Sequence, residues 1–379
     1  MSEWTTIRLG SVVRTNTTAY SPKEGWKYVN YLDTGNLTEN VIDAIQNIDL
    51  ANEKLPSRAK RKVQINSILY STVRPNQKHF GIIKSMPENF LVSTGFVVID
   101  VIPEKVDADY LYFWLTQKNV VEQLHAIAEQ SVSAYPSIKA SDIENLEITL
   151  PPLTVQKSIA SILKSISDKM SHNSNINENL EQQAGALYQS FFSPKSGTQG
   201  EVVTLDAYCS IFTGKKNANA SVEGGKYKFF TCAPDALQID SYIFDGNAII
   251  VSGNGAYTGR TRFYSGRFDL YQRTYACTLF ENINPDYIFP LYWFVKLELS
   301  KKIMGGTRGS AIPYIVMNDL AKFEFIYNEE TFTTYMPIFK SLTESIQANE
   351  FENECLAEIR DALLPRLMSG ELDVSNLDL

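Results

Sequence analysis

The part of this 379-residue chain whose spacing most invites a chemical interpretation is residues 252–259, SGNGAYTG, which follow a predicted strand. Glycine-rich loops in that position bind phosphate groups through their backbone N–H groups. This loop lacks the third glycine of a dinucleotide-binding loop, because Thr258 stands there, and no Gly-Lys-Ser/Thr follows as in a triphosphate-binding loop. We therefore predict a hairpin or a recognition loop here.

A second stretch that could carry chemistry is residues 284–287, NPDY, which are similar to the Asn/Asp-Pro-Pro-Tyr/Phe motif of amino-methyltransferases. Asp286 replaces the second proline, and the matching residues 107–110, DADY, lack both prolines. We therefore predict a helix N-terminus capped by Asn284 or Asp286. The sequence has no nuclease-like cluster of carboxylates with lysine, no Cys/His dyad and no Ser-His-Asp order. We expect no catalytic residue in this chain.

The cysteines and histidines do not suggest a metal site. The four cysteines never form a CxxC motif, and the three histidines lie far apart, so we expect neither a disulfide nor a zinc framework. No apolar run approaches the roughly 20 residues of a membrane span, and the first residues do not resemble a signal peptide. We predict a cytoplasmic protein that binds no metal, cofactor or membrane.

The positive charges point to nucleic acid once the chain is divided. The net charge of −8 is concentrated in residues 326–379, with 3 Lys or Arg and 11 Asp or Glu, whereas residues 1–150 and 201–325 are nearly neutral. Each of these two regions has a basic cluster interleaved with Tyr, Asn or Gln, which are side chains that contact phosphates and base edges. A solvated basic face is the alternative for one cluster alone, but a cluster in both halves favours DNA. The residues predicted to bind DNA are Arg58, Lys60, Arg61, Lys62, Arg74, Gln77, Lys78, Tyr135, Lys215, Lys216, Asn254, Tyr257, Arg260, Arg262, Arg267, Tyr271, Arg273 and Arg308.

One phrase occurs twice, in residues 131–148 and 308–325, which align without a gap at an offset of 177 with six identical pairs out of 18. The similarity extends in both directions, for example from NSILYS to NAIIVS upstream. The chain is therefore predicted to be two copies of one unit. We interpret the phrase as a frame in which the shared proline ends a loop and the shared aspartate, Asp142 or Asp319, caps a turn.

Each copy ends in a predicted long helix. Apolar residues recur at steps of three and four through residues 151–193 and 328–370, with prolines or Gly370 at the ends. At about 1.5 Å per residue, each helix would be roughly 60 Å long. Single apolar stripes need a partner, so we predict an antiparallel pair of coiled-coil helices that separates the two domains. The residues predicted to pack in this pair are Ile159, Ile162, Ile166, Met170, Leu180, Leu187, Phe339, Leu342, Ile346, Leu356, Ile359 and Leu363.

The remainder of each copy contains short β-rich runs between Gly, Asn and Pro turns, and then a helical stretch at residues 107–124 or 285–302. This pattern predicts an α+β fold with two pseudo-twofold-related mixed α/β domains. The predicted boundaries are residues 1–150 for the first domain, 151–193 for the first long helix, 194–200 for a linker, 201–327 for the second domain, 328–370 for the second long helix and 371–379 for a tail.

Several motifs resemble those of one known family. Residues 151–156, PPLTVQ, resemble the opening of its central conserved region, and residues 360–371, RDALLPRLMSGE, are similar to its distal conserved region. The Ser-Ala-x-Pro-x-Ile phrase resembles the end of each of its target recognition domains. The chain as a whole thus resembles the specificity (S) subunits of type I restriction–modification systems. It departs from the pattern at Thr333 and Thr334, where the second copy would carry a glutamine like Gln156.

This resemblance implies a DNA-recognition subunit without catalytic activity of its own. Each mixed domain would be a target recognition domain that reads one half of a bipartite, asymmetric site in double-stranded DNA. The helix pair would dock two methyltransferase (M) subunits, and restriction (R) subunits would join the complex. S-adenosylmethionine would be bound by M for adenine methylation, and ATP with magnesium by R.

Two other functions stay open at this point. One is the recognition subunit of a two-component type II restriction–methylation enzyme, which the content of the partner gene would distinguish. The other is a coiled-coil scaffold that binds proteins and no DNA. A scaffold predicts no basic surface on the repeated domains, and the local basic clusters count against it.

Overall fold

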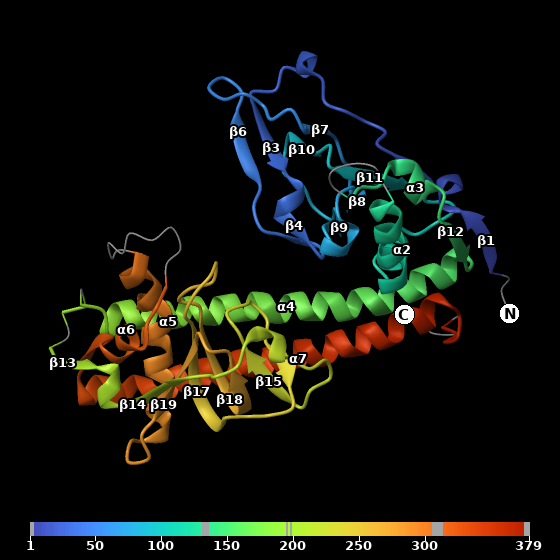
Figure 1. Ribbon diagram of the computed structural model, residues 1–379. Helices are drawn as coiled ribbons and strands as arrows, with labels where there is room; N and C mark the ends of the chain where they lie inside the picture. Colours follow the sequence, from blue (N-terminus) through green and yellow to red (C-terminus); the bar gives the residue numbers. More distant parts are fainter. Residues whose placement is uncertain (1–3, 131–135, 195, 198, 305–313, 375–379) are drawn as a thin grey trace. The chain divides into compact units, whose positions relative to one another are not determined.

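The computed structural model describes residues 4–130, 136–194, 196–197, 199–304 and 314–374, and most of its helices and strands are labelled in Figure 1. The chain divides into two compact units, of which the first is Met1–Met170 with Glu354–Leu379 and the second is Ser171–Asn353. Each unit therefore combines one mixed domain with a part of both long helices.

The first unit contains two four-stranded sheets, ordered β2-β11-β8-β9 and β6-β3-β10-β7. Leu69 and Val98 of the first sheet share an apolar cluster with Leu32 and Val92 of the second, so the two sheets enclose a core. The strands of these sheets are β2 (Val13–Thr15), β3 (Tyr28–Leu32), β6 (Gln46–Asp49), β7 (Ala59–Arg61), β8 (Ile68–Ser71), β9 (Phe80–Ile82), β10 (Phe90–Ser93) and β11 (Phe96–Val101), and a small hairpin is formed by β4 (Leu37–Thr38) and β5 (Val41–Ile42).

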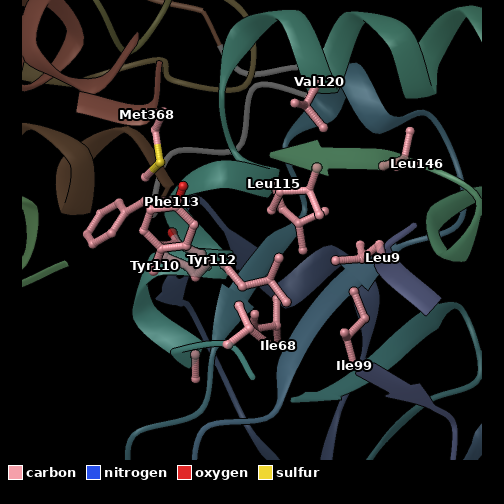
Figure 2. Close-up of a cluster of buried hydrophobic side chains, with 14 of the residues drawn as sticks. Leu9, Ile68, Ile99, Tyr110, Tyr112, Phe113, Leu115, Val120, Leu146 and Met368 are labelled. Atoms are coloured by element: carbon pink, nitrogen blue, oxygen red, sulfur yellow. The ribbon is translucent and has the colours of Figure 1, made fainter. Parts of the chain in front are cut away.

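Helices cover the other face of the β2-β11-β8-β9 sheet. They are α1 (Ala108–Leu115), α2 (Lys118–Glu129) and the short α3 (Ala140–Glu144). Figure 2 shows Ile68 and Ile99 of the sheet near Leu115 of α1, and Met368 from the end of the second long helix belongs to the same cluster. The helical stretch predicted for residues 107–124 is two helices, because the chain turns between α1 and α2.

The second unit has one six-stranded sheet, ordered β14-β19-β17-β18-β15-β16, which curls around an apolar cluster that includes the fully buried Phe268. Gly246 and Gly266 pair across β17 and β18 with φ angles of 140° and 130°, a conformation that favours glycine and bends the hairpin. Lys216 after β14 and Tyr271 after β18 form a parallel bridge, which joins opposite parts of the curled sheet. The strands are β14 (Cys209–Thr213), β15 (Tyr227–Phe230), β16 (Leu237–Ile239), β17 (Phe244–Ser252), β18 (Thr261–Leu270) and β19 (Thr274–Leu279).

The other face of this sheet packs on α5 (Ile288–Met304), since Ile249 and Val251 of β17 share a cluster with Trp293 of α5. The Trp293 Nε1–H donates to the hydroxyl of Thr343 on the second long helix at 2.9 Å. The indole therefore ties that helix to the domain, because a buried N–H needs an acceptor.

The NPDY stretch begins a helix, as predicted. The Asn284 side chain accepts a hydrogen bond from the N–H of Asp286 at 3.0 Å at the start of the short turn Pro285–Tyr287. Asn284, and not Asp286, is therefore the cap. Asp286 instead forms an ion pair with Lys340 at 2.9 Å.

The two units repeat one plan. The first four strands of the second sheet, β14-β19-β17-β18, follow the order of β2-β11-β8-β9, and each unit adds a two-stranded antiparallel sheet. These small sheets are β1 (Thr5–Arg8) with β12 (Glu147–Leu150), and β13 (Glu201–Thr204) with β20 (Glu324–Tyr327). At the start of α3, the Asp142 carboxylate accepts from the Lys139 N–H at 2.7 Å, and at the start of α6 (Met317–Ala321), Asp319 accepts from the Val316 N–H at 2.9 Å. The predicted role of the shared aspartate is confirmed in both copies, whereas Pro313 lies outside the described residues.

The two long helices are α4 (Leu153–Phe191) and α7 (Glu329–Met368). In the second unit they are antiparallel, because Asn173 bonds to Asn353, Asn177 bonds to Asn349, and Phe191 stacks on Tyr335 with ring centroids 4.2 Å apart. The first two contacts form a polar layer, which we call the asparagine quartet. By the repeat, Asn173 and Asn177 correspond to Asn349 and Asn353 at an offset of 176, so the two hydrogen bonds are equivalent.

Most residues predicted to pack in the helix pair are at least half-buried. Ile159, Phe339, Leu342 and Ile346 are buried, and Ile162, Ile166, Met170, Leu180, Leu187, Leu356 and Leu363 are half-buried. Ile359 departs from the prediction, with 49% of its surface exposed. Ile359 follows Leu356 by three residues, a rotation of about 300°, so it lies roughly 60° from Leu356 at the edge of the apolar stripe. The predicted C-cap, Gly370, has a φ of 77°, as left-handed caps require.

Candidate nucleic-acid interface

The repeated phrase fixes the base of one loop in each unit. In the first unit, the Ile138 N–H donates to the carbonyl of Thr72, the first residue after β8, at 2.8 Å. In the second unit, the Ile315 N–H donates to the carbonyl of Gly253, the first residue after β17, at the same distance of 2.8 Å. Ile138 and Ile315 are identical partners in the repeat, and both strands end in the matching NSILYS and NAIIVS segments. Two loops, residues 72–79 and 253–260, are thus held in the same way.

The first loop carries three of the predicted DNA-binding residues on its surface, since Arg74, Gln77 and Lys78 are all exposed. Arg74 and Lys78 flank the turn Pro75–Gln77 with φ angles of 47° and 57°, a left-handed conformation that is costly for residues with long side chains. The Arg74 N–H donates to the carbonyl of Pro136 at 3.0 Å, which supports that conformation. The Lys78 ammonium is 2.7 Å from the carboxylate of Glu39.

Arg58 joins this loop at its base. The carbonyl of Arg58 accepts a hydrogen bond from the Thr94 N–H at 2.8 Å. Gly95, which follows Thr94, accepts through its carbonyl from the Thr72 N–H, also at 2.8 Å. The positive charge of the exposed Arg58 also lowers the pKa of Asp33. Burial alone would raise the pKa of Asp33, but hydrogen bonds from neighbouring N–H and hydroxyl groups, together with the charge of Arg58, hold it below its usual value.

The other three basic residues of the first cluster lie in β7 or directly after it, and their surroundings differ. Arg61 is half-buried and donates to the side chain of Asn16 and the carbonyl of Phe96, and burial lowers its pKa. Lys62 forms an ion pair with Glu24 and lies 5.1 Å from the ring centre of Trp26. Lys60 is exposed. Arg61 is therefore engaged within the unit, while Lys60 keeps an accessible charge.

The second loop is the connection between β17 and β18, so the prediction of a hairpin for residues 252–259 is confirmed. The Gly253 N–H donates to the carbonyl of Arg273 at 2.9 Å, and a Cβ atom at Gly253 would lie 2.4 Å from that same oxygen, so glycine is required. Arg260 and Tyr257 are exposed, with the guanidinium carbon 5.6 Å from the centre of the phenol ring. Asn254 is half-buried beside them in sequence.

Two exposed cations lie on segments joined to this loop. Arg273 follows β18 in the turn that bonds to Gly253, and Lys215 follows β14. Gln272, next to Arg273, donates through its amide to the side chain of Asn217 at 2.9 Å, so the two segments are linked. Arg273, Lys215, Tyr257 and Arg260 therefore belong to one connected set of loops.

Three other predicted residues of the second unit are occupied within it. The Lys216 ammonium lies 2.8 Å from the carboxylate of Asp269, which is 1% exposed. Arg262 donates to the carbonyls of Ala233 and Pro234, and burial lowers its pKa. Tyr271 is half-buried and bridges to Lys216 through the backbone.

Arg267 is placed away from the loop, at the opposite end of β18 from Arg260. Its guanidinium forms an ion pair with Asp245 at 2.9 Å and lies 5.1 Å from the ring centre of Tyr242. The two remaining predicted residues, Tyr135 and Arg308, lie outside the described residues.

Sequence reasoning missed Asn217 and Gln272. Both are exposed amides that stand next to predicted residues, in the segments KKN and YQR. The available signal was this adjacency, since amide side chains beside cations suit base and phosphate contacts. Their hydrogen bond to each other could not be foreseen, because 55 positions separate them.

Other chemistry-bearing groups do not assemble. Within the part of the chain that the structure describes, no three His, Cys, Asp or Glu side chains are grouped so that they could hold a metal ion. Burial raises the pKa of the Cys209 thiol to about 12 and keeps it protonated. Over the same residues, no helix has the length and apolar character needed to cross a membrane.

Comparisons with known proteins agree with this arrangement. A family model described as the type I restriction modification DNA specificity domain matches residues 1–182. The specificity subunit of the type I restriction enzyme EcoDI from Escherichia coli is 35% identical over 179 residues, which cover 45% of this chain and 38% of that protein. The HindI specificity subunit from Haemophilus influenzae is 27% identical over 225 residues, which cover 59% of this chain and 48% of that protein. The chain thus spans less than half of the length of either relative.

A solved structure shares the fold. The S subunit of a type I restriction-modification system from M. genitalium superposes with a TM-score of 0.61 over 97% of this chain and 96% of that chain, at 16% identity. In sequence, the chain is thus similar to the specificity subunits of type I restriction-modification systems, with the family match over residues 1–182.

Proposed function

We propose that this chain is the DNA sequence-recognition subunit of a type I restriction–modification complex. The observation that carries the proposal is the pair of loops, residues 72–79 and 253–260, each fixed by the same backbone hydrogen bond from the repeated phrase. Both loops present exposed cations, and residues 1–182 match the type I restriction modification DNA specificity domain. Cations on loops bind phosphates, and neighbouring amides read base edges.

The two loops differ in sequence, which supports an asymmetric, bipartite site. The first presents Arg74, Gln77 and Lys78, and the second presents Tyr257 and Arg260. Residues 1–150 and 201–327 would be the two target recognition domains, each reading one half of the site in double-stranded DNA. Fewer residues are proposed to contact DNA than the sequence suggested, because Arg61, Lys216 and Arg262 bond to groups inside their own units.

The helix pair would dock two methyltransferase (M) subunits, and restriction (R) subunits would complete the assembly. Exposed apolar side chains on the helices support a protein partner, since Ile176 is 47%, Ile338 42% and Phe351 68% exposed. Large apolar residues in such positions commonly mark protein interaction sites. In this assembly S-adenosylmethionine would be bound by M, and ATP with magnesium by R, so this chain would carry no catalytic residue or cofactor.

The experiment is to express this chain with its neighbouring methyltransferase gene and to map modified adenines across the host genome. We expect one bipartite motif with a fixed gap. Exchange of residues 201–327 for those of a relative should change only one half of the motif. If partner and expression are verified and no motif appears, the proposal fails, and a protein-interaction scaffold without DNA binding becomes the better explanation.

A second test locates the DNA face, using two matched arginines, Arg260 directly before β18 and Arg267 within it. Arg260 and Arg267 are both exposed and both lie over a tyrosine ring, but at opposite ends of the strand. Arg260→Ala should weaken binding and lower the slope of log K against log salt by about 0.9, the value for one phosphate contact. Arg267→Ala should leave both quantities unchanged. The reverse result would place the DNA face at the other end of β18.

A further inference from the structure

The amides of Asn217 and Gln272 form an exposed pair between two segments of the second unit. The Gln272 Nε2–H donates to Asn217 Oδ1 at 2.9 Å, and both residues are exposed. We propose that this pair reads the edge of an adenine in the half-site of the second recognition domain. The inference rests on the proposed function and deepens it, because it assigns one base to two named side chains.

The pair stands on a rigid base. The Gln272 N–H donates to the carbonyl of Lys216 at 2.9 Å, and the Thr213 hydroxyl donates to the Gln272 carbonyl at 2.9 Å. Beneath it, the Lys216 ammonium and the Ser241 hydroxyl each lie 2.8 Å from the buried carboxylate of Asp269. The backbone segments that carry Asn217 and Gln272 are therefore fixed before DNA binds. Side chains on an ordered backbone lose less conformational freedom on binding.

The hydrogen-bonding groups that remain on the pair match adenine. After the mutual bond, Gln272 keeps its Oε1 acceptor and one N–H, and Asn217 keeps both N–H donors of its amide. Adenine offers an N6 donor beside an N7 acceptor in the major groove, whereas guanine offers two acceptors there and cytosine one donor. Guanine and thymine offer no donor to the Gln272 Oε1 atom, and cytosine offers no acceptor to the Asn217 N–H groups, so adenine is the base that matches both.

Charges next to the pair would hold the DNA backbone. Two exposed cations stand close to the pair in the sequence. Lys215 lies two residues before Asn217, and Arg273 directly follows Gln272. The turn that carries Arg273 also accepts the hydrogen bond from Gly253, so the pair adjoins the loop of residues 253–260. Phosphate contacts of this kind set the register in which a base-reading group meets its base.

A second amide pair on this chain provides a matched control. In the first unit, Asn47 Nδ2–H donates to Asn30 Oδ1 at 3.0 Å between β6 and β3. That pair adjoins Glu88, whose carbonyl accepts from Asn30 at 2.8 Å and whose carboxylate accepts from Tyr28 at 3.0 Å. A carboxylate repels phosphates, so this pair has the same chemistry but the wrong surroundings for DNA.

The test compares Gln272→Ala, Asn217→Ala and the control Asn47→Ala in the complex with the methyltransferase subunit. We expect the first two to relax one adenine position in one half-site, with a loss of discrimination of about 5- to 150-fold, and the control to keep the motif. Binding of the purified complex to an oligonucleotide with 7-deazaadenine at that position, which lacks the N7 acceptor, should weaken for the wild type and not for Asn217→Ala, which has already lost the donor to N7. Gln272→Glu, which keeps the shape but not the N–H of the mutual bond, should also relax the position.

The outcomes separate the two proposals. If the wild-type complex yields no bipartite motif, the proposed function fails and the adenine assignment falls with it. If the wild type yields a motif that remains unchanged in Gln272→Ala, Asn217→Ala and Gln272→Glu, the amide pair is not a reader, although the proposed function stands. Relaxation at a guanine or cytosine position would also overturn the assignment to adenine.

Discussion

The asparagine quartet predicts unequal costs for two mutations at positions that the repeat makes equivalent. Asn173 is 1% exposed, and its amide donates to Asn353 at 2.9 Å and to the carboxylate of Glu352 at 2.7 Å. Asn349 is only half-buried and donates to Asn177 at 2.7 Å. The repeat makes these residues counterparts, but one is buried with a charged acceptor and the other is not.

The expected losses follow from these bonds. A neutral hydrogen bond stabilises by about 1 kcal/mol net, and one to a charged group by about 1.5–3 kcal/mol. Asn173→Ala removes one of each, so its free energy of unfolding should fall by about 2–4 kcal/mol. Asn349→Ala removes one neutral bond in a partly hydrated position and should cost about 1 kcal/mol.

The measurement is urea unfolding of the full chain, with the helix content followed by far-UV circular dichroism. Because the chain has two units, the transition that responds should be assigned with a tryptophan signal from Trp293, which bonds to α7 in the second unit. Asn173→Leu is the informative second variant, since an apolar residue there restores burial without the polar contacts and should recover most of the loss. Equal costs for Asn173→Ala and Asn349→Ala would refute the argument that burial and the Glu352 carboxylate set the difference.

Three further predictions concern residues that the structure removes from the DNA-binding set or places in exposed ion pairs. Arg61→Ala breaks hydrogen bonds from a half-buried cation and should lower the free energy of unfolding by about 2–3 kcal/mol. Lys60→Ala on the same strand should change that free energy by less than about 0.5 kcal/mol, because Lys60 is exposed. Equal effects of the two mutations in urea unfolding would contradict this prediction. Lys216→Ala leaves a buried carboxylate without its cation and should cost about 3 kcal/mol, so an unchanged melting temperature would show that the ion pair does not hold the curled sheet closed. The hydrogen bond from Lys322 lowers the pKa of Asp206 in the folded state. The stabilisation from this ion pair is therefore present above the unfolded pKa of about 3.9 and is lost as the pH falls through the lower folded pKa. Lys322→Ala should make the stability less dependent on pH in acid, which urea midpoints between about pH 2 and 5 would measure.

The larger features could be predicted from the sequence because each depends on a regular pattern. The repeat offset anticipated two units with one plan, and the three-four periodicity anticipated α4 and α7. The helix caps at Asp142 and Asp319 depend on local contacts over three residues, so the sequence was sufficient to place them, whereas it narrowed the third cap only to Asn284 or Asp286.

The candidate site was harder to predict because its contacts are distant in sequence. Arg61, Lys216 and Arg262 have the composition of a basic DNA-binding surface, and nothing next to them in the sequence indicates that they are engaged. Their partners come from far along the chain, for example a buried carboxylate 53 positions after Lys216. Composition counts charges, but only the fold decides which of them remain accessible to a phosphate.

The same comparison explains how one frame can present two different readers. Ile138 and Ile315 fix the two loops through backbone bonds of equal length, 2.8 Å, which do not depend on the side chains that the loops carry. Beyond that point the loops are held differently, by left-handed Arg74 and Lys78 in the first unit and by a close approach at Gly253 in the second. Because the frame uses backbone groups, loop side chains can change without moving the strands beneath them. Under the proposed function, a change of recognised base therefore requires a change of loop and leaves the repeated phrase intact.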